Sequence, residues 1–189
     1  LSYIVRQTED KINTLIYILG KVPGPAIVYV RNRKRTKEIA VLLQQAGISA
    51  DFFHAGLNRD DKNLRQNRWK NNECRVIVST NAFGMGIDKP DVRLVVHMDM
   101  PGSLEEYYQE AGRAGRDEQR AYAVALCSNI DCTKLKKRLA DEFPDRDFIS
   151  RVYDALGNYY QIAMGFGLDT VHDFSLVDFC TAYKFSHLQ

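Results

Sequence analysis

The chain has 189 residues and a formal net charge of +2, with hydrophobic residues making up 45% and charged residues 26% of the sequence. This balance is typical of a soluble globular protein, and no apolar run approaches the roughly 20 residues that a membrane-spanning helix needs. The chain opens on Leu1 within a strand-like pattern and shows no secretory signal, so we expect it to be a piece of a longer protein.

Short apolar runs alternate with helical patterns through the first part of the chain. Pro25–Val30 is short, rich in β-branched residues and entered through a Pro-Gly-Pro turn, which predicts a buried strand. Thr36–Gly47 has apolar side chains at helical spacing and ends on a glycine, which predicts a helix and its stop. A second strand is expected within Ile48–Gly56, followed by a polar, weakly amphipathic helix over Arg59–Glu73.

Three further strands are predicted at Arg75–Thr80, Val92–Met100 and Ala121–Ser128. Between the last two, Ser103 begins a helix with a capping box that Glu106 completes. Strands that alternate with helices predict an α/β fold, with a largely parallel sheet covered by helices on both faces.

The pattern becomes helical and amphipathic after about Asn129, with breaks at Pro144, Gly165 and Gly167. We therefore expect an α/β domain over residues 1–130. Residues 131–189 are expected to form a small helical extension or the start of a further domain.

Ligand sites in parallel α/β sheets lie beyond the carboxyl ends of the strands. That rule places four segments along one rim of the predicted sheet: Arg31–Arg33, His54–Gly56, Ser79–Thr80 and Met100–Ser103. The first of these opens the basic run RNRKRTK, which is compatible with phosphate binding. A solvated helix start explains that run equally well.

The four cysteines, Cys74, Cys127, Cys132 and Cys180, are scattered and include no CxxC pair. This spacing favours free, buried thiols in a reducing environment, and we expect no zinc. A zinc site that uses Cys127 and Cys132 with histidines is the alternative.

The segment Ser79–Val92 combines a strand end with two glycines. Its hydroxyls can meet phosphate oxygens, Gly84 and Gly86 allow close backbone approach, and Asp88 can accept from a ribose hydroxyl. The third glycine of a dinucleotide-binding fingerprint is missing, which excludes that motif. A glycine-containing turn between strands is the structural alternative.

Arg113 and Arg116 each follow a glycine, at the end of the helix that Ser103 begins. A guanidinium group is always charged and presents a donor fork that matches phosphate. Arginines that offset the dipole of the helix would explain one of the two, but not the second glycine.

These residues resemble a known family. The string QEAGRAGRD resembles the Q-x-x-G-R-x-x-R element of superfamily 2 helicases, and AFGMGIDKPDVR is similar to the preceding element of RecQ-type DNA helicases. Ala26–Leu57 resembles the segment that opens the second RecA-like lobe of that family. The resemblance covers roughly residues 1–130, with the motifs in the family's order.

The resemblance implies a role for each matching residue. Gln109, Arg113 and Arg116 would face ATP held by a first lobe and act in catalysis, with Gly86 and Asp88 on the nucleotide side. The residues expected to contact the DNA backbone are Asn32, Arg33, His54, Gly56, Ser79 and Thr80.

It also implies ATP and Mg²⁺, bound mainly by the first lobe, and single-stranded or junction DNA as the partner of a repair or recombination helicase. This sequence contains no G-x-x-x-x-G-K-[ST] loop, and the DEFP string at Asp141–Pro144 follows a charged helix rather than a strand, so the chain alone should be inactive. The protein would act in the nucleoid of bacteria or the nucleus of eukaryotes.

Many RecQ proteins carry a four-cysteine zinc subdomain after the second lobe, whereas here that stretch holds only Cys132 and Cys180. Two alternatives stay open: a nucleic-acid-binding module without catalysis, and an RNA helicase lobe of the same superfamily.

Overall fold

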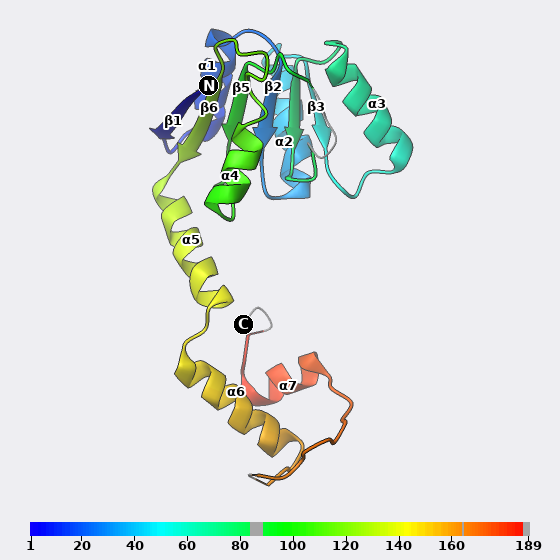
Figure 1. Ribbon diagram of the computed structural model, residues 1–189, viewed down its shortest axis with the longest axis vertical. Coiled ribbons are helices and arrows are strands. Elements are labelled where there is room, and N and C mark those ends of the chain that lie inside the picture. Colours follow the sequence, from blue (N-terminus) through cyan, green and yellow to red (C-terminus); the bar gives the residue numbers. More distant parts are fainter. Residues whose placement is uncertain (84–88, 164, 187–189) are drawn as a thin grey trace. The chain divides into compact units, whose positions relative to one another are not determined.

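The computed structural model describes residues 1–83, 89–163 and 165–186, and its contacts divide the chain into two compact units, Leu1–Asp131 and Cys132–Gln189 (Figure 1). The first unit holds a six-stranded sheet. Its strands are β1 (Ser2–Gln7), β2 (Ala26–Tyr29), β3 (Ala50–Phe53), β4 (Val76–Ser79), β5 (Leu94–His97) and β6 (Tyr122–Cys127). Its helices are α1 (Lys11–Lys21), α2 (Arg33–Gln45), α3 (Arg59–Lys70) and α4 (Leu104–Ala111), and α5 (Asn129–Glu142) begins at its end.

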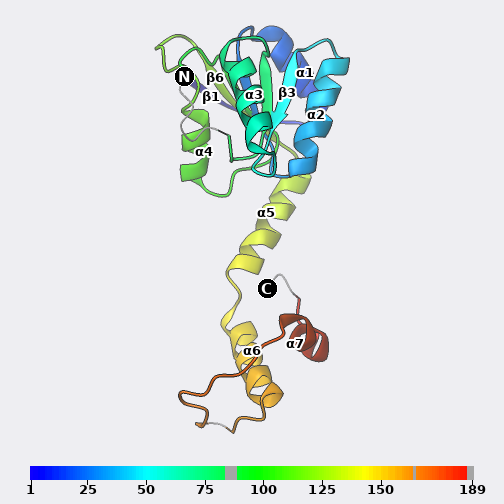
Figure 2. The same ribbon diagram turned by 90° about the vertical axis from the view of Figure 1, so that its right-hand side faces the viewer.

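The strands follow the order β1-β6-β5-β2-β4-β3, and every neighbouring pair is parallel. One face of the sheet packs against α1 and α2, and the other packs against α3 and the segment that follows α4 (Figure 2). The predicted α/β fold, with a parallel sheet covered on both faces, is therefore confirmed. The three central strands β2, β4 and β5 are wholly buried, as strands with two covered faces must be.

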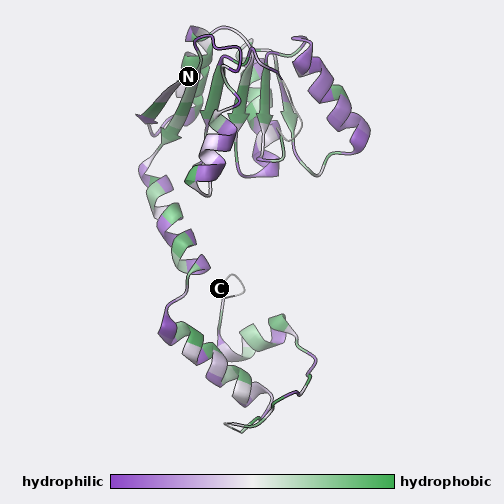
Figure 3. Cartoon of the chain, viewed as in Figure 1, coloured by the Kyte–Doolittle hydropathy of each residue, from purple (hydrophilic) through white to green (hydrophobic). Residues whose placement is uncertain are grey.

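The sheet is hydrophobic and α3 is hydrophilic along nearly its whole length (Figure 3). The polar sequence of α3 predicted this weak amphipathicity, yet Trp69 near its end is fully buried. The indole Nε1 of Trp69 donates a hydrogen bond to the carbonyl of Ala26, 3.2 Å away, and the ring packs against Phe83. Trp69 thus attaches an otherwise polar helix to the sheet, together with Arg65 and Arg68, which pair with Asp51 of β3.

Two elements differ from the prediction. Helix α1 was not predicted, although Leu15, Ile18 and Leu19 form its buried stripe and Asp10 caps its start. The strand expected over Val92–Met100 is limited to β5, because ladder pairing with β2 and β6 ends at His97.

The second unit is helical, as its amphipathic pattern predicted. Pro144 separates α5 from α6 (Arg146–Tyr159), and Asp145 caps α6 by accepting from the Phe148 N–H. Helix α7 (Leu176–Tyr183) contributes Phe179 and Cys180 to a small core around Ala155 of α6. Among the described residues, no helix is long and apolar enough to cross a bilayer.

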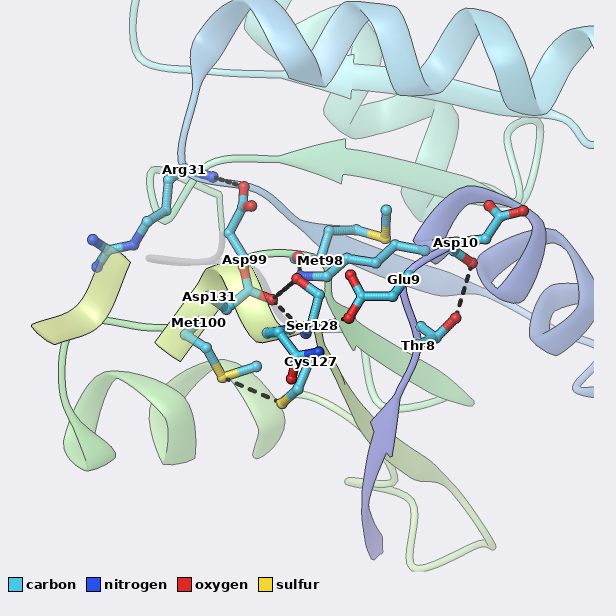
Figure 4. Close-up of polar contacts among 12 residues, drawn as sticks. Thr8, Glu9, Asp10, Arg31, Met98, Asp99, Met100, Cys127, Ser128 and Asp131 are labelled. Carbon is cyan, nitrogen blue, oxygen red and sulfur yellow. Dashed lines mark hydrogen bonds and ion pairs between the residues drawn. The ribbon is translucent and has the colours of Figure 1, made fainter. Parts of the chain in front are cut away.

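A nearly buried ion pair joins three elements of the first unit. Lys11 Nζ, at the start of α1, lies 2.6 Å from Asp131 Oδ2 in α5 and donates to the carbonyl of Met98 after β5. The same carboxylate oxygen accepts from the backbone N–H and the hydroxyl of Ser128, which lies beside it in Figure 4. Burial alone would raise the pKa of Asp131, but the bonds from Lys11 and Ser128 outweigh it and lower the pKa.

Replacing Asp131 with alanine should lower the free energy of unfolding by roughly 3 kcal/mol at neutral pH, because Lys11 would stay largely buried without its partner. A carboxyl with a lowered pKa stabilises the fold above its unfolded pKa of about 3.9, and that contribution is lost as the pH falls through the folded pKa. Chemical denaturation of wild type and Asp131→Ala should therefore give a difference that shrinks in acid. Glu142→Ala, at the exposed end of the same helix, is the control, and a difference independent of pH would contradict the assignment.

Candidate functional site

The parallel registers bring the carboxyl ends of β2, β3, β4 and β5 to one edge of the sheet. Arg31–Arg33 follow β2, His54 follows β3, Thr80 follows β4 and Met98–Pro101 follow β5. The rim predicted from the strand order is thus present, and it holds most of the residues expected at nucleic acid.

One part of the rim brings Arg33, His54 and Gly56 together. A Cβ atom on Gly56 would lie 3.3 Å from His54 Nδ1 and 3.4 Å from Arg33 Nη1, so the three residues are immediate neighbours. Burial, and then the charges of Arg33, Arg65 and Lys62, lower the pKa of His54. Within the described part of the chain, the buried Nδ1 atom of His54 has no hydrogen-bond partner. The positive charges of Arg33 and Lys62 beside the imidazole make this a place where an added anion is stabilised.

Two of the residues expected at nucleic acid have structural contacts of their own. The Asn32 carboxamide oxygen accepts from the Lys34 N–H at 2.8 Å and caps α2. Ser79 is fully buried, and its hydroxyl lies within hydrogen-bond distance of the carbonyls of Phe53 and Thr80. The hydroxyl of Ser79 is therefore turned inward, and we do not include it in the proposed interface below. Asn32 still places the amino end of α2 at the rim.

A cavity of about 190 Å³ opens between the ends of β2, β4 and β5. Its walls include Arg31, Thr80 and Asn81, which carry hydrogen-bond donors, and the carboxylates of Asp99 and Glu106. Asp99 accepts from the Arg31 backbone N–H at 3.0 Å, a contact drawn in Figure 4, and pairs with Arg35 Nη1 at 2.9 Å. We call this space the rim pocket.

Sequence reasoning missed three rim-pocket residues. Asn81 and Asp99 each lie two residues beyond a strand end, where the topology rule could have located them. Glu106 was interpreted only as a helix-capping residue. As expected at a capped helix start, the Glu106 N–H donates to Ser103 Oγ at 3.2 Å. The Glu106 carboxylate, however, accepts from Asn81 Nδ2 and from the Gly102 N–H.

The arginine-bearing segment leaves α4 as the sequence predicted. Ser103 caps the start of the helix and Gly112 ends it. Arg113 is half-buried, with its guanidinium beside the Tyr29 hydroxyl, and the exposed Arg116 donates from Nε to the Gly112 carbonyl at 3.3 Å. Both arginines line a shallow depression with Trp69, Phe83 and Lys89.

Gly115 explains the second glycine of this segment. Its φ of +70° lies in the left-handed region, and its N–H donates to the Val92 carbonyl at 2.9 Å. A Cβ atom there would lie 3.0 Å from the Ala121 Cβ and 3.1 Å from the Gln119 carbonyl oxygen. The glycine thus lets the chain turn tightly between the two arginines and return to the sheet.

The arginine segment and the rim lie on different parts of the first unit. The N–H groups of Gly115 and Asp117 bond to the carbonyls of Val92 and Pro90, which precede β5, whereas the rim lies beyond its other end. Gln109 is exposed on α4. The predicted nucleotide-side residues Gly86 and Asp88 lie outside the described residues. Lys89 donates from Nζ to the Lys70 carbonyl and to Asn72 Oδ1.

The four cysteines are present as free thiols. In the described ranges, no group of three or more His, Cys, Asp and Glu side chains is arranged to hold a metal ion.

Residues 10–118 match the family model described as "Helicase conserved C-terminal domain". The chain is 46% identical over 130 residues to the ATP-dependent DNA helicase Q1 of Pongo abelii, an alignment that covers 66% of this chain and 20% of that protein. It is 39% identical over 145 residues to the ATP-dependent DNA helicase RecQ of Pasteurella multocida, covering 76% of this chain and 23% of that one. It therefore spans about a fifth of the length of these curated relatives.

Among solved structures, the E. coli DEAD-box protein SrmB superimposes with a TM-score of 0.63 at 28% sequence identity, over 71% of this chain and 82% of that one. The fold of the first unit is thus RecA-like.

Replacing Gly115 with alanine should destabilise the fold by roughly 1–2 kcal/mol, because the new Cβ must be held at positive φ and in tight contact. Gly20→Ala is the matched control. Gly20 lies in α1 with open space around its Cβ position, so alanine there should stabilise the helix by about 0.5–1 kcal/mol. Thermal and urea unfolding of both variants measures the two effects, and equal shifts in the same direction would contradict this explanation of Gly115.

Proposed function

Since the chain belongs to the family of helicase conserved C-terminal domains, we propose that it is the second motor lobe of an ATP-dependent DNA helicase of the RecQ type. The observation that supports this most is the arginine segment. A capped helix and a glycine-specific turn hold Arg113 and Arg116 at one depression on the surface. In this proposal, the depression faces a first lobe that carries the phosphate-binding loop.

The donors in the arginine segment fit a nucleoside triphosphate. Two guanidinium forks, from Arg113 and Arg116, are fixed positive charges that match phosphoryl oxygens. When it is bound between the two lobes, ATP supplies a phosphoryl group whose hydrolysis drives the motor. Arg116 is exposed and joined to α4 through Gly112, which suits a side chain that meets the phosphate across a closing cleft.

The two arginines differ in how they are held. Arg113 is half-buried beside the Tyr29 hydroxyl, which suits a residue that holds the segment and adds a second charge. In the proposal, Gln109 contacts the nucleotide from the exposed side of α4, and Gly86 and Asp88, which lie outside the described residues, are further nucleotide contacts. In the proposal, Mg²⁺ is held mainly by the first lobe, and we assign no metal step to this chain.

The rim is proposed to bind the backbone of single-stranded DNA. Arg33, His54 and Gly56 form one contact area, Thr80 and the rim pocket another, and Asn32 places the amino end of α2 at the rim. Such contacts go to phosphates rather than base edges, so binding should depend strongly on salt and weakly on sequence. In this mechanism, closing and opening of the two lobes moves the rim along the strand.

Replacing Arg33 with alanine should reduce the slope of log affinity against log salt for single-stranded DNA by roughly 0.7–1, because one phosphate contact is lost. Lys37→Ala removes the same charge one turn further along α2, away from the rim, and is the control. Titration of a fluorescent oligonucleotide at several salt concentrations measures the slope. If the slope falls equally in both variants, the effect comes from net charge alone and Arg33 is not part of the interface.

In the longer protein, Arg116→Ala should lower DNA-stimulated ATP turnover by roughly 10³-fold while nucleotide affinity changes far less. Arg113→Ala should show a comparable loss of turnover. Arg120→Ala, an exposed arginine four residues beyond Arg116, is the control. Turnover, nucleotide affinity and melting temperature are measured on the same preparations.

Two results would defeat this proposal. The first is an Arg116→Ala protein that keeps its turnover. The second is ATP hydrolysis above background by the isolated 189-residue chain, since that would require a complete ATPase site within it. DNA binding without any effect of Arg113 or Arg116 on turnover would favour the alternative, a nucleic-acid-binding module with no catalytic role.

A further inference from the structure

The rim pocket contains a carboxylate that holds the groups a phosphate would need. Glu106 Oε1 accepts from Asn81 Nδ2 at 3.1 Å, and Oε2 accepts from the Gly102 N–H. Arg31 Nη2 lies 3.7 Å from the same Oε2 atom. An amide, a backbone N–H and a guanidinium converge on one carboxylate, and these are the donors that also bind phosphate oxygens.

Carboxylates outnumber guanidinium groups around the rim pocket. Arg31 and Arg35 contribute two positive charges, and Asp99 and Glu106 contribute two carboxylates that contact them. The third wall carboxylate, Glu110, is hydrogen-bonded to His97 Nε2 at 2.8 Å. A phosphate that enters with Glu106 in place therefore meets a filled donor set and a like charge, which opposes binding.

The exposure and length of the two carboxylate side chains, and their distances to arginine, favour Glu106 as the one that moves aside. Asp99 is held by the Arg31 backbone N–H at 3.0 Å and by Arg35 at 2.9 Å, and its side chain is 17% exposed. Glu106 pairs with Arg31 only at 3.7 Å, its side chain is 29% exposed, and it has one more rotatable bond than Asp99. Glu106 can turn out to solvent from the first turn of α4, whereas Asp99 fixes the backbone after β2.

We propose that Glu106 acts as a competing carboxylate, which occupies Arg31, Asn81 and the Gly102 N–H until a phosphate of the nucleic-acid backbone displaces it. The inference rests on the proposed function, because it assumes that the rim binds such a backbone. The phosphate binds only when Glu106 has turned away, so the apparent affinity falls by the fraction of time that the donors are free. Return of Glu106 to its donors promotes release of the phosphate, which suits a lobe that must let go of the strand in every cycle.

Glu106→Gln tests the proposal directly. The amide keeps the shape of the side chain and removes its charge, so the 189-residue chain should bind single-stranded DNA roughly 10-fold more tightly, equivalent to about 1.4 kcal/mol. Glu105→Gln is the matched control. Glu105 lies beside Glu106 in the first turn of α4, so both variants lose the same interaction with the helix dipole and change net charge equally. The control should change affinity less than twofold, and equal gains in both variants would overturn the proposal.

A second background separates competition for donors from a general charge effect. In Arg31→Ala protein, Glu106 has lost the cation it competes for, so adding Glu106→Gln should give much less than the gain seen with Arg31 present. A full gain in both backgrounds would overturn the proposal, as would unchanged or weaker binding by Glu106→Gln protein of normal melting temperature.

The same titrations distinguish this inference from the proposed function. If neither wild type nor Glu106→Gln binds single-stranded DNA, both fail. If wild type binds and Arg33→Ala changes the salt slope as expected, but Glu106→Gln gives no gain in affinity, only the proposal of a competing carboxylate is wrong.

Discussion

The burial of β2, β4 and β5 on both faces is the constraint on which the other features of the first unit depend. Strands covered on two sides are apolar along most of their length, so polar residues gather at their carboxyl ends and just beyond them. Because the strands are parallel, those ends meet at a single edge. A basic run, a histidine and a threonine that are far apart in sequence thereby become neighbours. The buried strands offer no binding groups to a ligand, but they determine where the binding residues lie.

A buried polar network connects the two candidate surfaces of the first unit. His97 is fully buried at the end of β5, with Nε2 bonded to Glu110 of α4 and its ring stacked on Tyr29 at 5.5 Å. Glu110 and Tyr29 line the rim pocket, and the Tyr29 hydroxyl lies beside the Arg113 guanidinium. Burial raises the pKa of Tyr29, so its hydroxyl keeps its proton and donates to the Phe83 carbonyl. Polar contacts thus hold the end of α4 in place. The same side chains, Tyr29, His97 and Glu110, link the rim pocket to the arginine segment.

Sequence patterns predicted the strands well, because short β-branched runs between turn residues have few other solutions. They also located Ser103 and Gly112, since helix caps follow local chemistry. The sequence patterns could not predict which residues from distant segments would contact one another. Asn81 and Glu106 are 25 residues apart and meet only because β4 and α4 do. The sequence suggested a functional reason for Gly115, but the structure gives a structural one: a Cβ atom at this position would crowd Ala121 and Gln119. Helix α1 was not predicted, although Leu15, Ile18 and Leu19 form an ordinary amphipathic stripe.

The pairing of β1 with β6 has a consequence for the order in which the first unit assembles. Ser2 lies opposite Tyr122, so this ladder closes a loop that contains nearly the whole unit. Closing such a loop costs more chain entropy than any local pairing. All six residues of β1 are exposed, so little apolar burial offsets that cost. We therefore expect β1 to join the sheet last during folding and to detach first in native-state hydrogen exchange, while the central strands stay protected.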